Sequence, residues 1–435
     1  MISGRYVYDA LYGPMTYPDY VWDAALCPEF QRLREIRMCN INSLCLTGGS
    51  NISRYEHCLG VAHLALECLS SWPLGPSVEE TQRVVLAALL HDVGSSAFGH
   101  SVQYVIANQG FEHESLYDIV SGHAEDGGFA YRRALAEPIY FGSPRRLHAL
   151  LDDSSLRAIS DMVEGKGEFG PLISGTLDLD NIDNVFRLAY HVGLTRDGSA
   201  ALRLARCLSV HNGKLTLGPG SEGLLREWYD VRRRLYEFLL LNRDEFSAKC
   251  MLEEALEFTA AHDPACFRWN DVDFELLEKL STSSDEARQI ISRLAVGDLY
   301  GCAGIFSCPD LAVYDSLKNP YFRSDLESAL EVAIRATANG PFRKAIPALH
   351  VIKDVNKTQR KITLPCLDGT EVTVGVPTRR ILIGVFFKNV RLSMAKLTSE
   401  QTADTFLIAA IKDTLMRVTR QPLLTTMPMY GELCA

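Results

Sequence analysis

The stretch AALLHDVGSSAFGHS, residues 87–101, begins as an apolar helix and then places His91 beside Asp92. The residues before this pair, TQRVVLAALL, are apolar on nearly every side, so the helix is predicted to lie in the core. A helix relaxes in its last turn, which lets neighbouring imidazole and carboxylate groups converge on one point. His100 follows shortly afterwards. The stretch therefore predicts a buried helix that ends in side chains of the metal-ligand type.

Two other segments place side chains of the same type at expected helix ends. SRYEHCLG carries His57, and LDLDNIDN carries three aspartates, Asp178, Asp180 and Asp183. A single buried histidine is more often a core residue than a ligand, but an ordered series of H, HD and D in apolar helices favours a metal site. Imidazole and carboxylate together suit Mn, Fe, Co, Ni, Zn or Mg better than copper or an iron–sulfur cluster. Such an ion lowers the pKa of bound water.

Composition limits the classes of protein that the chain can belong to. With 435 residues and 47% hydrophobic content, it is long enough to form a large core. Its 44 Lys and Arg against 54 Asp and Glu give a net charge of −10, which argues against extended nucleic-acid binding. No apolar run is long enough to cross a membrane, the first residues resemble no signal peptide, and the 12 cysteines form no C-x-x-C pair. We expect a cytoplasmic protein without a membrane-bound part.

Helical periodicity dominates the chain from residue 28 to about residue 300. PEFQRLREIRMC is predicted to be a helix that begins at Pro28, and LDNIDNVFRLAYHVG a helix that ends at Gly193. CLSVHNGKLTLG alternates around Asn212-Gly213, which predicts a hairpin. Long helical patterns return between residue 221 and residue 296.

The pattern changes after about residue 300. RKITLPCLDGTEVTVGV alternates around Asp368-Gly369, and RRILIGVFF is a strong strand candidate, with helical patterns on either side. The predicted fold is mainly α: a helical bundle over residues 1–300, with its core at about 28–260, and a smaller α+β region over 301–435.

Taken together, these motifs resemble the HD-domain metal-dependent phosphohydrolases. Within them, the chain is most similar to the deoxynucleoside triphosphate triphosphohydrolases, without the SAM domain that some of them carry. PEFQRLR, SRYEHCLGVAHLA, LLHDVGSSAFGHS, FEHES and LDLDNIDNVFRLAYHVG follow in the order of that family, over roughly residues 8–260. The resemblance implies an HD-type helical domain. It also implies a homo-oligomer, a dimer or tetramer, that the C-terminal region helps to build.

The same resemblance assigns four metal ligands and a set of catalytic and substrate-binding residues. The ligands of one divalent ion would be His57, His91, Asp92 and Asp180, with Asp180 chosen because it lies one residue into its helix, which leaves Asp178 to cap that helix. His113 would protonate the leaving oxygen, Glu114 would orient it, and His100 would line the pocket. The residues matching substrate contacts are Arg54, Arg232, Asn181 and Asn184.

Several residues of this sequence differ from those of the family that it resembles. Ser95 stands where a catalytic histidine is expected, and Gln103 where an acidic residue is expected. Asn181 and Asn184 replace a phosphate-contacting lysine and a tyrosine beside the sugar. Further replacements are Leu26, Leu188 and the pair Leu240-Leu241. The substrate-binding residues have therefore changed more than the metal ligands.

These observations leave three functional hypotheses. The first is hydrolysis of a nucleotide, by default a deoxynucleoside triphosphate with release of inorganic triphosphate. The second is an HD-type phosphodiesterase, in which His100 and His113 help to bind a second ion, or a phosphatase with another nucleotide substrate. The third is a non-catalytic nucleotide sensor or scaffold.

Overall fold

The structure is a computed structural model that describes residues 5–39, 51–99, 102, 116–122, 145–338, 340–390 and 401–426. The predicted catalytic residues His100, His113 and Glu114 lie outside these ranges, as does Gln103. Within the described ranges, no helix is both long and apolar enough to cross a membrane.

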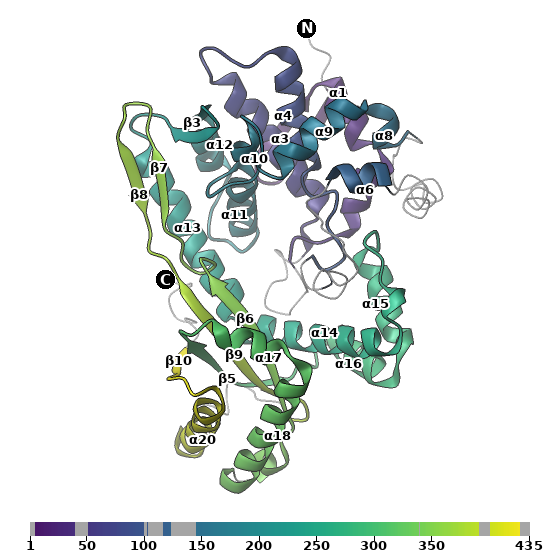
Figure 1. Cartoon of the computed structure of the whole chain (residues 1–435), viewed down its shortest axis with the longest axis vertical. Coiled ribbons are helices and arrows are strands. Elements are labelled where there is room, and N and C mark those ends of the chain that lie inside the picture. The colour runs from purple at the N-terminus through teal and green to yellow at the C-terminus, as the bar shows by residue number, and fades with distance from the viewer. Residues whose placement is uncertain are drawn as a thin grey trace.

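A bundle of helices forms the upper half of the molecule in Figure 1. Its central members are α3 (Arg54–Ser70), α4 (Val78–Leu90) and α11 (Leu179–His191). Around them lie α1 (Asp19–Ala25), α6 (Leu116–Gly122), α8 (Leu147–Leu150), α9 (Asp153–Val163), α10 (Gly170–Ile173), α12 (Ser199–Arg206) and the hairpin of β1 (Arg5–Asp9) with β2 (Gly13–Tyr17). The whole second half of α4, from Val84 to Leu90, is buried, which confirms that this helix lies in the core.

Local sequence signals correctly located several chain reversals. Gly193 has a φ of 78° just after α11, where the amides of Gly193 and Leu194 bond back to carbonyls of the last turn. Asn212 and Gly213 have φ values of 51° and 68° and join β3 (Leu208–His211) to β4 (Lys214–Leu217). Both residues of a tight two-residue hairpin loop of this kind need positive φ. The predicted helix end and hairpin are confirmed.

The helix predicted for residues 28–39 is much shorter than expected. Pro28 does begin α2 (Pro28–Gln31), but a 3₁₀ turn (Arg32–Glu35) follows and Ile36 is extended. The carbonyl of Ile36 accepts from the amide of Arg54, and the amide of Met38 donates to Ile52. A non-local pairing with the chain that leads into α3 thus replaces the helical hydrogen bonds.

Two long helices carry the chain from the bundle to the lower half of the molecule. α13 (Glu222–Leu241) and α14 (Arg243–His262) are separated at Asn242, whose ψ of 123° breaks the helical path. The Asn242 Oδ1 accepts from the amides of Asp244 and Glu245 and so caps the second helix. A 3₁₀ turn (Pro264–Cys266), α15 (Asp273–Ser283) and α16 (Asp285–Ala295) follow.

A four-stranded antiparallel sheet organises the lower half. Its strand order is β10 (Leu424–Thr426), β5 (Gly301–Cys308), β9 (Arg379–Phe387), β6 (Pro347–Val355). On β9, Leu382 and Phe386 belong to the same core as α14, whereas Ile383 and Val385 belong to the core on the opposite face. The helices on that face are α17 (Ala312–Lys318), α18 (Pro320–Thr337) and α20 (Gln401–Thr419), and a 3₁₀ turn (Gly340–Lys344) precedes β6.

A hairpin arm runs from this sheet back to the helical bundle, as Figure 1 shows. It consists of β7 (Ile362–Pro365) and β8 (Glu371–Val374), joined at the predicted Asp368-Gly369 turn. Ile362, Leu364 and Val374 are buried in the same core as α3 and α4. The mainly α fold with a smaller α+β part is confirmed. The domain boundary near residue 300 stays a prediction. The arm, which follows this boundary in sequence, packs against the helical bundle that precedes it.

Candidate metal centre

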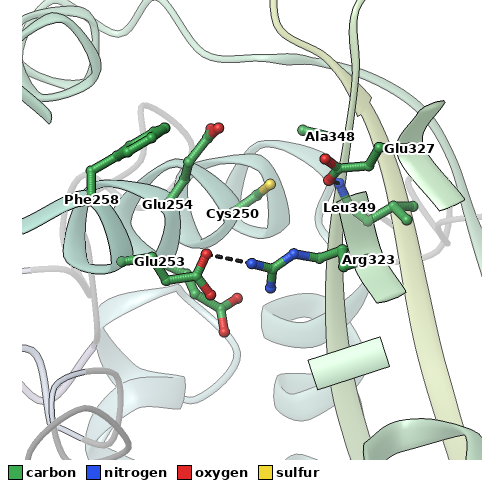
Figure 2. A pocket seen from close by; sticks show the side chains of 9 residues that line it. Cys250, Glu253, Glu254, Phe258, Arg323, Glu327, Ala348 and Leu349 are labelled. Atoms are coloured by element: carbon green, nitrogen blue, oxygen red, sulfur yellow. Dashed lines mark hydrogen bonds and ion pairs between the residues drawn. The ribbon is translucent and has the colours of Figure 1, made fainter. Parts of the chain in front are cut away.

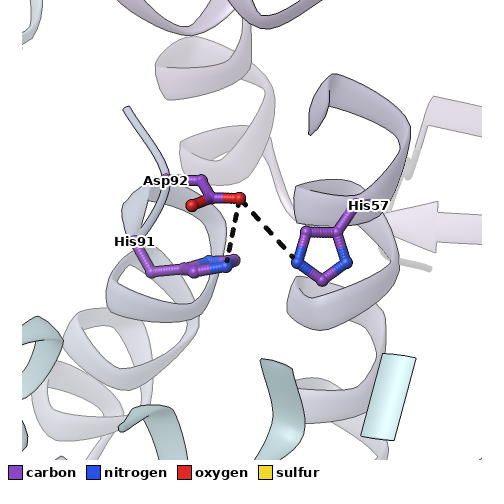
Figure 3. A group of neighbouring side chains, drawn as sticks. All are labelled: His57, His91 and Asp92. Atoms are coloured by element: carbon purple, nitrogen blue, oxygen red, sulfur yellow. Dashed lines mark ion pairs between the residues drawn. The ribbon is translucent and has the colours of Figure 1, made fainter. Parts of the chain in front are cut away.

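Three helix ends bring the predicted metal ligands to one place. Helix α3 is capped by the Ser53 hydroxyl, which accepts from the amide of Glu56, and His57 lies at the end of its first turn. His91 and Asp92 directly follow α4, and Asp180 lies in the first turn of α11. Figure 3 shows the ring of His57 facing His91 and Asp92 across a short gap.

The distances between the polar atoms define a compact group. Single ligand atoms of His57, His91 and Asp92 all lie within 4.8 Å of one another. Asp180 Oδ1 is 3.0 Å from Nε2 of His57 and 3.7 Å from Nε2 of His91. Asp92 Oδ2 is 3.9 Å and 3.7 Å from the same two nitrogens. Ligands about 2.1 Å from one ion lie about 3.0–3.4 Å apart at octahedral or tetrahedral angles, so a small contraction would suit a divalent ion.

Hydrogen bonds on the far side of each imidazole ring favour the form that binds metal. His91 Nδ1 lies 2.9 Å from the carbonyl of Ala88, so an N–H at this position donates there. His57 Nδ1 lies 2.7 Å from Asp183 Oδ1 and donates in the same way. In the neutral form of each ring with this tautomer, the lone pair of Nε2 faces the gap. The Nε2 of His91 is buried and has no hydrogen-bond partner within the described residues. Buried polar atoms usually have a partner, so this nitrogen is a good candidate for a metal ligand.

Asp92 is held by two donors and stays ionised. Arg54 Nη1 donates to its Oδ2 at 2.6 Å, and the Ser95 hydroxyl donates to its Oδ1 at 2.9 Å. Burial raises the pKa of Asp92, but Arg54, and then His91 and His57, outweigh burial and hold the pKa below its usual range. Ser95, which replaces an expected catalytic histidine, is therefore a direct neighbour of a candidate ligand.

The three aspartates of LDLDNIDN have three different roles. Asp178 caps α11 and accepts from the amides of Asn181 and Gly175, which confirms the predicted cap. Burial and then Asp180 raise the pKa of Asp178 to about 7. For Asp180, burial raises the pKa, but the nearby rings of His57 at 3.0 Å and His91 at 3.7 Å outweigh burial, and the pKa lies below its usual range. Asp183 is fully buried behind His57.

The roles of the predicted substrate contacts Asn181, Asn184 and Arg232 stay predictions. Asn181 uses its side-chain amide to donate to Asp178. Asn184 lies one turn after Asp180, and its buried Oδ1 has no hydrogen-bond partner within the described residues. Arg232 is 1% exposed and donates to the carbonyls of Asn356 and Lys357.

Sequence reasoning missed a buried arginine behind the site. Arg187 is fully buried, and its guanidinium pairs with Asp183, Asp9 and Glu56. The available signal was the spacing of Asp183 and Arg187, four residues apart on a helix whose other buried side chains are apolar. The N-terminal hairpin that carries Asp9 gave no such signal.

A second hollow lies between α14, α18 and β6, and Figure 2 shows its acidic lining. Its volume is about 250 Å³. Three of its carboxylates are already paired: Glu253 with Lys318 and His350, Glu254 with Lys388, and Glu257 with Arg323. Among the described residues, metal-type side chains gather closely enough for an ion only at His57, His91 and Asp92. The candidate chemistry therefore belongs to the helical bundle.

Several known proteins are similar to this chain in sequence. Residues 54–152 match the model of the HD domain family. A deoxynucleoside triphosphate triphosphohydrolase SAMHD1 homolog of Dictyostelium discoideum is 32% identical over 331 residues, which are 68% of this chain and 60% of that protein. The chicken (Gallus gallus) deoxynucleoside triphosphate triphosphohydrolase SAMHD1 is 26% identical over 64% of this chain and 52% of its own length. An uncharacterised protein of Methanocaldococcus jannaschii is 25% identical over 52% of this chain and 44% of its own length.

A solved structure shares the fold. The crystal structure of a phosphohydrolase from Bacteroides thetaiotaomicron superimposes with a TM-score of 0.60 at 16% identity and covers 89% of this chain and 100% of that one. The chain spans only 44% to 60% of the length of the three curated relatives above. Because the family match covers α3, α4 and the HD pair, residues 54–152 of this chain form an HD domain, and the chain resembles the deoxynucleoside triphosphate triphosphohydrolases.

Proposed function

We propose that this chain is a metal-dependent phosphohydrolase that acts on a nucleotide or another phosphorylated small molecule. The carrying observation is that His57 and His91 both turn a ring nitrogen toward the same gap, while their other nitrogens are occupied by Asp183 and Ala88. HD domains bind divalent metals, and one ion held by His57, His91, Asp92 and Asp180 fits this donor set.

A divalent ion in such a site supplies an activated water and polarises a phosphoryl oxygen. The protein's own residues do the rest. Asp92 and Asp180 stay ionised and balance the positive charge. Arg54 holds Asp92 with one terminal nitrogen, and we assign the remaining N–H groups of its guanidinium to a substrate phosphate. The resemblance assigns protonation of the leaving oxygen to His113, which, like Glu114 and His100, lies outside the described residues.

A deoxynucleoside triphosphate, cleaved to a deoxynucleoside and inorganic triphosphate, is the default substrate. The names of the relatives from Dictyostelium discoideum and chicken support it. Asn184 also supports a nucleotide, because its buried Oδ1 lies one turn from Asp180 and lacks a partner within the described residues. Asn181 and Arg232 stay candidate substrate contacts by resemblance alone, since both side chains already make hydrogen bonds within the protein.

A nucleotide panel tests the proposal. The purified protein is incubated with deoxynucleotides and ribonucleotides carrying one, two or three phosphates, in the presence of Mn²⁺, Fe²⁺, Co²⁺, Ni²⁺, Zn²⁺ or Mg²⁺, and the products are identified by mass spectrometry. We expect triphosphate release that is abolished in Asp92→Ala. The matched control is Asp152→Ala, which removes an exposed aspartate at the start of α9. Absence of any phosphate, pyrophosphate or triphosphate release would contradict the proposal.

The number of bound ions separates this function from a two-ion phosphodiesterase. The proposed function has about one ion per chain, at His57, His91 and Asp92, whereas His100 and His113, the candidate ligands of a second ion, lie outside the described residues. Metal analysis by mass spectrometry that finds about two would favour the phosphodiesterase. We also propose a homo-oligomer, a dimer or tetramer, which light scattering on the eluting protein tests.

A further inference from the structure

A buried chain of charges stands behind the metal centre. Asp183 Oδ1 accepts from Nδ1 of His57 at 2.7 Å and from Nε of Arg187 at 2.8 Å, and its Oδ2 accepts from Nη2 of Arg187 at 3.1 Å. Arg187 Nη1 then donates to Asp9 Oδ2 at 2.7 Å. The Asp183 and Arg187 side chains are fully buried, and that of Asp9 is 2% exposed. These charged side chains therefore link an N-terminal hairpin, α11 and the candidate ligand on α3.

Helix α3 leaves room for these charged side chains at Gly60. A Cβ atom on Gly60 would lie 2.1 Å from Asp183 Oδ2 and 2.3 Å from Arg187 Nη2. Gly60 lies three residues after His57, so it faces α11 on the same side of α3. The absence of a side chain there lets Asp183 approach closely enough to accept from His57.

Geometry as well as charge shapes the bond to His57. Arg187 pairs with Asp183 and also with Asp9 and Glu56, so three carboxylates share one guanidinium and Asp183 is held in place while its Oδ1 also contacts the imidazole. A buried ion pair needs good geometry and satisfied hydrogen bonds, and this network supplies both without the imidazole. The additional short contact to Nδ1 acts on the histidine.

We infer that Asp183 is a positioning residue that fixes His57 as a metal ligand, with Arg187 and Asp9 holding Asp183 in place. This inference rests on the proposed metal site. A carboxylate that accepts from one ring nitrogen of a histidine fixes the proton there, orients the ring and makes the other nitrogen a better donor. Asp183 thus keeps the proton of His57 on Nδ1 and points Nε2 at Asp180 and Asp92.

Metal affinity tests the inference apart from activity. Mn²⁺ binding is measured by titration calorimetry on the unaltered protein, Asp183→Ala and Asp183→Asn, at a temperature where circular dichroism shows each to be folded. Loss of such a carboxylate typically weakens metal binding by about 10- to 100-fold, which we expect for Asp183→Ala. Asp183→Asn should lose less, since its amide oxygen can still accept from Nδ1. Unchanged affinity in the folded Asp183→Ala protein would overturn the inference.

The matched control is Glu67→Gln. Glu67 lies on the same helix and pairs with Arg206 at 2.6 Å, but this pair is partly exposed and belongs to the opposite end of α3. It should leave Mn²⁺ affinity unchanged. If Glu67→Gln weakens Mn²⁺ binding as much as Asp183→Ala does, the effect is a general loss of stability and the inference is wrong.

A second measurement does not depend on the folding of any variant. Nitrogen-edited NMR of the unaltered protein loaded with diamagnetic Zn²⁺ should show His57 protonated at Nδ1, with that proton at low field because it is shared with Asp183. A His57 protonated at Nε2 would overturn the inference. If the unaltered protein binds neither Mn²⁺ nor Zn²⁺, the proposed function itself fails, and this result is distinct from a variant without effect.

Discussion

The hydroxyl of Ser95 donates a hydrogen bond of 2.9 Å to Oδ1 of Asp92, the carboxylate whose other oxygen accepts from Arg54. Ser95 is buried, and its own amide also bonds to the carbonyl of Asp92. A serine at this position can hold the ligand in one orientation, whereas an imidazole would carry a second titrating proton into the site.

Ser95→Ala should therefore weaken metal binding while leaving the fold intact. A hydrogen bond to a charged group contributes about 1.5–3 kcal/mol, which corresponds to a loss of roughly tenfold or more in Mn²⁺ affinity if the bond acts on the ligand. Calorimetric titration measures this loss. Ser155→Ala is the matched control, since Ser155 donates to Asp152 over the same distance of 2.9 Å and the same separation in sequence, far from the site. Equal affinity in Ser95→Ala and the unaltered protein would refute this role.

Removal of the metal should destabilise the protein. Two ionised aspartates, Asp92 and Asp180, face the gap, and an ion that binds only the folded state stabilises it by about 2.7 kcal/mol at a free concentration of one hundred times Kd. Differential scanning fluorimetry should show a lower Tm after treatment with a chelator, restored by Mn²⁺. Asp180→Ala should respond much less to Mn²⁺. If the Tm stays the same after addition of the chelator and after addition of Mn²⁺, the ion does not contribute to the stability of the fold.

Gly60→Ala should destabilise the protein although alanine favours helices. The new methyl group would collide with Asp183 and Arg187, and overpacking of this kind costs about 1–3 kcal/mol. Gly223→Ala is the matched control, because a Cβ on Gly223 in α13 meets no atom within 4 Å. That variant should be neutral or gain up to about 1 kcal/mol. Urea unfolding compares the two, and equal midpoints would contradict the close approach at Gly60.

Arg232→Met should lower the free energy of unfolding. The substitution leaves the carbonyls of Asn356 and Lys357 without their donor, and a buried unsatisfied group costs about 1–3 kcal/mol. Arg233→Met is the control, because Arg233 forms a partly exposed pair with Glu237 whose contribution is below about 1 kcal/mol. Chemical denaturation measures both, and the larger loss in Arg233→Met would show that Arg232 is not the residue that anchors the 356–357 loop.

Local signals in the sequence predicted caps, turns and one strand correctly, including the helix start beside the candidate site. Asp178 has the preferred chemistry of an N-cap and two backbone donors bond to it, which places Asp180 in the first helical turn, as expected. Gly193 and Asn212-Gly213 adopt the positive φ values that their residue types permit. RRILIGVFF forms a strand with the predicted bounds.

Contacts between segments distant in sequence could not be predicted from local sequence patterns. The apolar spacing of Phe30, Leu33 and Ile36 predicts a helix, and all three side chains are fully buried. The backbone nevertheless leaves the helical path because residues 36–38 pair with residues 52–54, which no local pattern reveals. The bond from His57 to Asp183 and the contacts of Asp9 with Arg187 likewise join distant segments.

The arm formed by β7 and β8 has a consequence for the newly synthesised chain. Its side chains Ile362, Leu364 and Val374 complete a core whose other members come mostly from the first 230 residues. A ribosome must therefore translate as far as Val374 before that core can close. Until then, the apolar surface around β4 is exposed and accessible to chaperones. The helical bundle that holds the metal site can therefore complete its folding only after residues far along the sequence have been synthesised.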